Sequence, residues 1–155
     1  MIKAAAFSLD RKYRYALWRI WDRRKPICMF IGLNPSTADE NIDDPTIRRC
    51  KNYSADWNYG GICMTNLFAF RSTHPHDLLN TLKPIGPENN TWLMYLAIHS
   101  KIVVACWGNW GTMSKRNEEV RKLIPNLYCL STTKRGQPKH PLYVPIAVKL
   151  KQYRP

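Results

Sequence analysis

The chain has 155 residues, of which 45% are hydrophobic and 23% charged, which predicts a single domain with its own core and excludes an intrinsically disordered protein. Lysine and arginine outnumber aspartate and glutamate by 24 to 11, so the formal net charge is +13. No apolar run approaches the ~20 residues of a membrane-spanning helix, and the opening residues lack a signal-peptide pattern, so we expect a cytoplasmic protein with no membrane partner.

The first 25 residues are ambiguous between a hairpin and a short helix, and we interpret them as an N-terminal hairpin that extends a single domain over residues 1–155. They contain eight basic side chains, and residues 115–155 contain ten. A basic face formed from both ends suits a polyanion, most simply nucleic acid. A solubilising surface is the alternative interpretation.

Four short apolar runs predict strands, at residues 27–33, 62–70, 102–107 and 127–130. They are continuous rather than alternating, which is typical of strands buried on both faces of a parallel sheet. Helical patterns separate them, at residues 45–60, 87–99 and about 114–124. Asp44 and Pro45 form an N-cap and a first-turn proline. The sequence therefore predicts an α/β protein, a three-layer α/β/α sandwich with a central, mainly parallel four-stranded sheet.

Polar side chains follow these predicted strands, where ligands bind in open α/β sheets. Asn34 follows the first strand, Asn66 lies in the second, and His140 lies in the loop after the fourth. Asn66 stands among apolar residues, so its carboxamide is expected to be buried and to need partners. A structural explanation stays open, since Asn34 could cap the turn that Gly32 and Pro35 shape.

Four segments resemble motifs of the uracil-DNA glycosylase superfamily, especially its mismatch-specific branch, and occur in that family's order. They are IGLNPS, MTNLFAFR, VVACWG and KHPLYVP, within residues 27–145. With DDPTIRRC and GPEN added, the whole chain resembles more closely an uncharacterised bacterial and phage family, domain of unknown function 1643. The superfamily resemblance implies a uracil-DNA glycosylase-like fold, whereas the second family implies no activity.

The superfamily resemblance implies a role for each matching position. Asn34 would orient water or stabilise the sugar cation, Asn66 would read the base edge, and His140 would stabilise the departing base. Asp39 is a candidate general base, while Asp44 is expected to cap its helix. The remaining implied contacts are Gly32, Pro35 and Ser36 in the pocket, Leu142 as a wedge behind the flipped nucleotide, and Lys134, Arg135 and Lys139 on phosphates. The chain departs from the superfamily after Pro35, where no aromatic residue follows, and Phe68 or Phe70 is the candidate substitute for that stacking ring.

The cysteines and histidines indicate no metal and no cofactor. Five cysteines are odd in number and widely spaced, and four lie in apolar runs, so neither a disulfide framework nor a zinc or iron–sulfur site is expected. His74 and His76 form the only close histidine pair, in a segment that reads as a solvated loop.

Taken together, the sequence predicts a DNA glycosylase-like protein that flips a pyrimidine nucleotide, modified or not, and hydrolyses its N-glycosidic bond. DNA is the expected partner, with an affinity that falls as salt rises, and a monomer is expected. Two alternatives stay open. One is a hydrolase of a free nucleotide or nucleobase conjugate, and the other is a non-catalytic DNA-binding module, which fits asparagine rather than aspartate at position 34.

Overall fold

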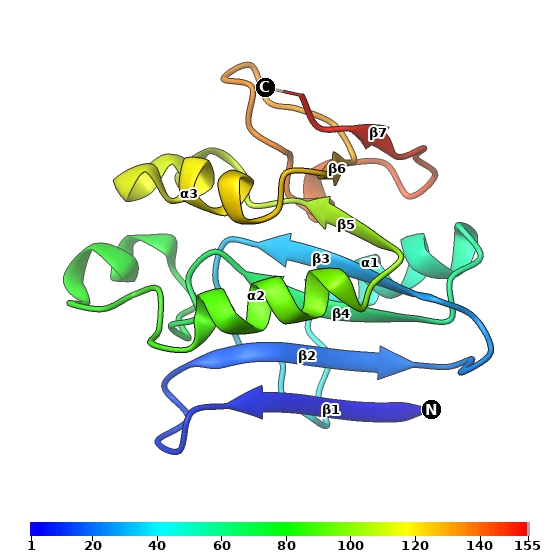
Figure 1. Ribbon diagram of the computed structural model, residues 1–155, viewed down its shortest axis with the longest axis horizontal. Helices are drawn as coiled ribbons and strands as arrows, with labels where there is room; N and C mark the ends of the chain where they lie inside the picture. The colour runs from blue at the N-terminus through cyan, green and yellow to red at the C-terminus, as the bar shows by residue number, and fades with distance from the viewer. Residues whose placement is uncertain (155) are drawn as a thin grey trace.

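A mixed sheet of seven strands, in the order β1-β2-β4-β3-β5-β6-β7, organises the computed structural model, which describes residues 1–154 (Figure 1). The strands are β1 (Ile2–Phe7), β2 (Arg14–Ile20), β3 (Ile27–Gly32), β4 (Gly61–Asn66), β5 (Ile102–Ala105), β6 (Tyr128–Cys129) and β7 (Lys151–Gln152). The helices are α1 (Pro45–Asp56), α2 (Asn89–Ile98) and α3 (Arg116–Leu123), with the short 3-10 helices η1 (Pro75–Asn80), η2 (Asn109–Lys115) and η3 (Pro141–Tyr143).

The four apolar runs form the middle of this sheet. Strands β4, β3, β5 and β6 are adjacent and parallel, as predicted. The sheet is nevertheless larger and more mixed than the predicted four-stranded one, because β1, β2 and β7 add antiparallel strands at its two sides. The missed β7 is only two residues long, too short for a periodic signal.

The N-terminal segment is a hairpin, as predicted, but it is more than an extension. Strand β2 pairs with β1 on one side and with β4 on the other, so it lies inside the sheet. Tyr15, Ala16 and Leu17 are buried there. Because β2 runs antiparallel to β4, the start of β2 lies beside the end of β4.

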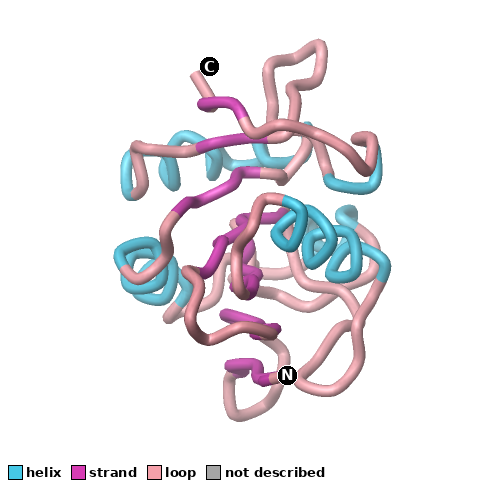
Figure 2. Tube along the Cα trace, turned by 90° about the vertical axis from the view of Figure 1, so that its right-hand side faces the viewer, coloured by secondary structure: helices cyan, strands magenta, loops and turns pink. Residues whose placement is uncertain are grey.

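Helices cover both faces of the sheet, as Figures 1 and 2 show. One core holds Leu93 and Leu96 of α2 with Val120 of α3, and the second core holds Ile47 and Tyr53 of α1. No helix within residues 1–154 is long and apolar enough to cross a membrane.

Helix α1 begins where the sequence predicts. Asp44 Oδ1 accepts a hydrogen bond from the backbone N–H of Ile47 at 2.9 Å, and Pro45 occupies the first turn, where its missing N–H costs nothing. The helix then ends at Asp56, before the predicted glycine pair.

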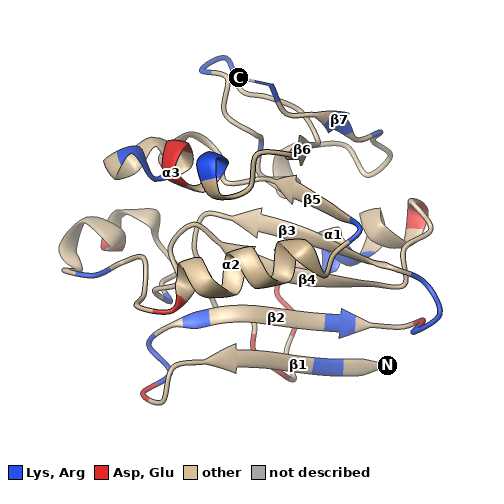
Figure 3. Cartoon of the chain, in the orientation of Figure 1, with Lys and Arg blue, Asp and Glu red and all other residues tan. Residues whose placement is uncertain are grey.

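Two arginines of β2 are buried and hold the segment that precedes α1. Arg19 donates from Nε to Asp43 Oδ1 at 2.7 Å and from Nη2 to the Asp39 carbonyl at 2.6 Å. Arg14 donates from Nη1 to the Ala38 carbonyl at 3.0 Å. Two of the eight basic residues near the N-terminus therefore lie in the interior. Figure 3 shows the lysines and arginines of the whole chain, which occur at both edges of the sheet.

We predict that Asp43→Ala destabilises the fold by about 3–5 kcal/mol, because it leaves the Arg19 guanidinium buried without its carboxylate. Urea unfolding would measure the change in free energy. The matched control is Asp22→Ala, which breaks an ion pair with Arg24, a side chain that is 91% exposed, and should not shift the midpoint measurably. Equal midpoints for Asp43→Ala and the wild type would show that Arg19 does not depend on Asp43.

Candidate functional site

A cavity of about 260 Å³ lies where strands β3 and β4 end. Its walls come from the start of β2, the segment after β3, the first turn of α1, the loop at residues 72–75 and helix η3. Among the sequence-predicted residues, seven line it: Gly32, Asn34, Pro35, Ser36, Asn66, His140 and Leu142. Segments more than 100 residues apart in the chain therefore meet at one site.

Asp39 is not among the residues that line the cavity. Its Oδ1 accepts hydrogen bonds from the backbone N–H groups of Asn41 and Ile42, both at 2.8 Å, and these bonds lower the pKa of its carboxyl. Asp39 thus closes a turn. The carboxylate that lines the cavity is Asp44, which also caps α1.

The predicted stacking ring does not reach the cavity. Phe68 is buried in the core beneath α2, and Phe70 lines a neighbouring groove with Arg71. In the described part of the chain, no Phe, Tyr or Trp side chain lines the cavity itself. Strand β4 ends at Asn66, so the strand alternation assumed for the following residues does not hold.

The predicted phosphate-binding residues lie beside the cavity rather than in it. Lys134 and Arg135 are exposed in a turn that a Gly136-to-Thr133 backbone hydrogen bond closes. Lys139 lines a groove that also includes His140 and Leu142.

The amide nitrogen of the Asn34 side chain is held by backbone carbonyls. Its Nδ2 donates to the carbonyls of Ser72 at 3.0 Å and of Pro35 and Phe70 at 3.3 Å. The capping role left open by the sequence is therefore present. Within residues 1–154 no donor bonds to Oδ1, so this oxygen stays available as an acceptor in the cavity wall.

Asn66 is buried, as its apolar neighbours predict, and its side chain lines the cavity. The only hydrogen bond of its carboxamide to the described protein is a long one of 3.5 Å, from Arg14 Nη2 to Oδ1. A Cβ atom at Gly32 would lie 2.9 Å from Asn66 Nδ2, so glycine is needed there to leave room for the carboxamide. Asn89 Nδ2 donates to the Asn66 carbonyl at 2.9 Å and fixes its backbone.

Arg14 is a cavity residue that the sequence analysis missed. The side chain is 2% exposed, and within residues 1–154 its Nε has no partner and no carboxylate bonds to its guanidinium. Burial lowers the pKa of Arg14 to about 10, while the charge of Asp44 opposes that shift, so the group is still a cation at neutral pH. The available signal was an arginine directly before the apolar residues Tyr15 to Leu17.

The surroundings of His140 favour a neutral imidazole that donates a hydrogen bond. Its Nδ1 accepts the backbone N–H of Leu142 at 3.2 Å, which assigns the ring proton of the neutral form to Nε2. Burial lowers the pKa of His140 below its ordinary value, and the charge of Asp44 opposes this. Within residues 1–154 no acceptor bonds to Nε2, so the neutral imidazole has an Nε2–H to donate, and His140 lines the cavity.

Cys106 also lines the cavity, yet it is not a nucleophile at neutral pH. Burial raises the pKa of its thiol, so the thiol stays protonated. Across residues 1–154, no three His, Cys, Asp or Glu side chains are grouped so that they could hold a metal ion.

A family model described as "Protein of unknown function (DUF1643)" matches residues 14–142. The chain belongs to this family. The match begins at Arg14 and ends at Leu142, so it spans every residue that lines the cavity. Searches of curated proteins and of solved structures found no match.

The lowered pKa of His140 predicts a loss of stability in mild acid. Between the folded pKa and the ordinary value near 6.5, the unfolded chain binds more protons, so stability rises with pH and is lost as pH falls through this range. We expect the wild-type melting temperature to fall more between pH 7.5 and 5.5 than that of His140→Gln. His74→Gln, at an exposed loop histidine, should keep the wild-type dependence. The same slope in His140→Gln and the wild type would contradict the buried, neutral imidazole.

Proposed function

We propose that the cavity binds a flipped nucleobase of DNA and that the protein hydrolyses its N-glycosidic bond, in the manner of the uracil-DNA glycosylase superfamily that its motifs resemble. The substrate base is a pyrimidine, modified or not. One observation carries the proposal: Asn34, Asn66 and His140 come from three separate segments and line the same cavity, each with a hydrogen-bonding atom that no protein group takes up fully.

Asn66 reads the edge of the base. A carboxamide donates to a ring carbonyl from Nδ2 and accepts a ring N–H at Oδ1, a bidentate contact worth about 1–3 kcal/mol of discrimination. In this protein the carboxamide is buried and held only by the long bond from Arg14, so a base would satisfy it.

His140 and Arg14 stabilise the departing base. When the bond between C1′ and the ring nitrogen breaks, its electron pair stays on the base as negative charge. The Nε2–H of neutral His140 donates to a base carbonyl, and the Arg14 cation adds a favourable field.

Asn34 and Asp44 act on the attacking water. Asn34 Oδ1 accepts one hydrogen bond from the water and orients it, while Asp44 accepts the proton that the water loses as its oxygen bonds to C1′. The base anion then takes up a proton from solvent and Asp44 returns its proton to solvent, so the products are a free base and an abasic sugar. Asp44 replaces Asp39 in this role because Asp44 lines the cavity.

We predict that Asn34→Ala and His140→Ala each slow base release on the order of 100-fold, with DNA affinity nearly unchanged because phosphate contacts dominate it. Asn66→Ala should relax the choice of base. Released base would be detected by mass spectrometry from DNA with varied bases, under single-turnover conditions. Wild-type rates in both alanine variants would dismiss these roles.

A matched pair decides between the two carboxylates. Asp44→Asn keeps a good N-cap and Asp39→Asn keeps the acceptor of its turn, so both should fold. We expect only Asp44→Asn to lose activity. DNA binding with no base released from any substrate would instead support the non-catalytic DNA-binding module.

A second candidate, a hydrolase of a free nucleotide, is favoured by one observation. Arg14 is a buried cation in the cavity wall, and no carboxylate of the described chain bonds to it. A phosphate is a natural partner for a guanidinium. In this case the phosphate of a small nucleotide, rather than the leaving base, meets Arg14.

This candidate predicts opposite effects of Arg14→Met on stability and on binding. Because an uncompensated buried charge is costly, the variant should unfold at the same or a higher urea concentration than the wild type. It should also lose binding of a nucleoside monophosphate, measured by calorimetry. Arg19→Met is the control and should be less stable, since it breaks the ion pair with Asp43. Unaltered nucleotide binding in Arg14→Met would reject this candidate.

A further inference from the structure

Two grooves adjoin the cavity and share lining residues with it. The basic groove, of about 550 Å³, is lined by Arg11, Lys12 and Arg71 and shares Ser36 and Thr73 with the cavity. The aromatic groove, of about 800 Å³, is lined by Trp110, Tyr143 and Lys139 and shares Leu33, His140 and Leu142 with the cavity. The three depressions therefore form one continuous track at the end of the sheet where β3 and β5 finish.

The arginine side chains of the basic groove are held in position by contacts within the protein. The guanidinium of Arg11 lies 3.8 Å and that of Arg71 lies 4.8 Å from the centre of the Phe7 ring. Arg11 pairs with Glu40 at the surface, but neither Arg71 nor Lys12 has a carboxylate partner within residues 1–154. Ordered cations beside hydroxyl groups suit phosphates of a nucleic-acid backbone.

The aromatic groove exposes rings at the surface. Trp110 is 40% exposed and Tyr143 is 80% exposed. Each meets another ring only at a steep angle, Trp110 with His76 at 67° and Tyr143 with His140 at 60°, so neither is stacked within the described chain. Exposed, unstacked rings that line a groove are the platform on which unpaired bases stack.

We propose that the protein takes its DNA as a single strand laid along this track, with phosphates in the basic groove, one base in the cavity and neighbouring bases on Trp110 and Tyr143. The inference rests on the proposed function, which takes the cavity as the base site. In a duplex the bases are already stacked on each other and their faces are closed to side chains, whereas a single strand presents them. Lys139 in the aromatic groove, and Arg135 beside Trp110, provide charge complementarity at that end.

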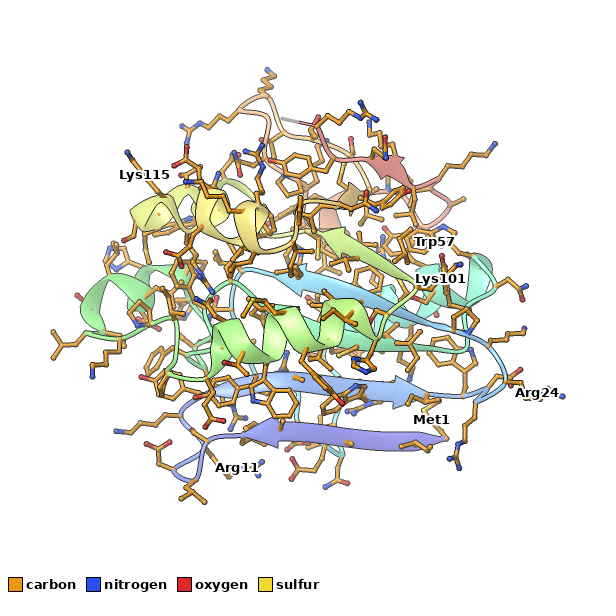
Figure 4. The ribbon with its side chains drawn as sticks, in the orientation of Figure 1. Met1, Arg11, Arg24, Trp57, Lys101 and Lys115 are labelled. Carbon is orange, nitrogen blue, oxygen red and sulfur yellow. The ribbon has the colours of Figure 1, made fainter. Side chains whose placement is uncertain are left out.

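Two residues outside the track provide matched controls. Figure 4 shows Lys101 at the opposite end from Arg11 and Lys115. Tyr95 of α2 is 57% exposed and lines neither groove nor the cavity. Changes at Lys101 and Tyr95 therefore remove a charge or a ring without touching the track.

The test is fluorescence anisotropy with a labelled single-stranded oligonucleotide and with a hairpin duplex of the same sequence. We expect the single strand to bind at least about tenfold more tightly. Trp110→Ala and Tyr143→Ala should each weaken single-strand binding about tenfold while leaving duplex binding nearly unchanged. Arg71→Ala should reduce the slope of log affinity against log salt by about one. Tyr95→Ala and Lys101→Ala should bind like the wild type.

Equal or tighter binding of the duplex would overturn the inference, as would wild-type single-strand affinity in both aromatic variants. Thermal unfolding of each variant by circular dichroism confirms that it is folded. The result is separable from the proposed function. Base release from duplex DNA without single-strand binding would overturn this inference alone, whereas tight single-strand binding without base release would overturn only the glycosylase chemistry.

Discussion

The buried ion pair between Arg19 of β2 and Asp43 is the interaction on which the placement of this site depends. Arg19 bonds to Asp43 and to the Asp39 carbonyl, and Arg14 bonds to the Ala38 carbonyl, so the segment between β3 and α1 is held against the sheet. That attachment sets where α1 begins and brings Asp44 to the cavity wall. Since an unpaired buried charge is costly, the segment has little freedom to move away.

Three polar side chains of the cavity each have one atom hydrogen-bonded to the backbone. Asn34 uses Nδ2 to bind backbone carbonyls, Asp44 uses Oδ1 to cap α1, and His140 uses Nδ1 to accept a backbone N–H. In each case the backbone fixes one atom and thereby orients the other polar atom of the same group. Groups held in this way need little reorganisation when a ligand binds, which is the condition for strong electrostatic stabilisation of developing charge.

The strand order explains why basic side chains lie at this site. Because β2 runs antiparallel to β4, its first residue, Arg14, lies beside the end of β4, and the β1–β2 turn brings Arg11 and Lys12 to the same end of the sheet. The loop after β6 brings Lys139 to the aromatic groove, which adjoins the cavity. The sequence interpretation made the N-terminal hairpin a peripheral extension. In the structure it provides the buried Arg14 of the cavity and two cations of the basic groove, Arg11 and Lys12.

The sequence by itself determined the four parallel strands, the start of α1 and the meeting of Asn34, Asn66 and His140, because apolar runs, capping residues and the ends of parallel strands are local signals. Only the tertiary structure decided that Arg14 is buried, that Asp44 rather than Asp39 lines the cavity, and that Phe68 packs into the core. Arg14 and Phe68 are buried by residues distant in the chain, and the segment that holds Asp39 and Asp44 is fixed by Arg19 of β2. The burial of a charged or aromatic side chain depends on which distant segments pack against it, and the neighbouring sequence does not specify those segments.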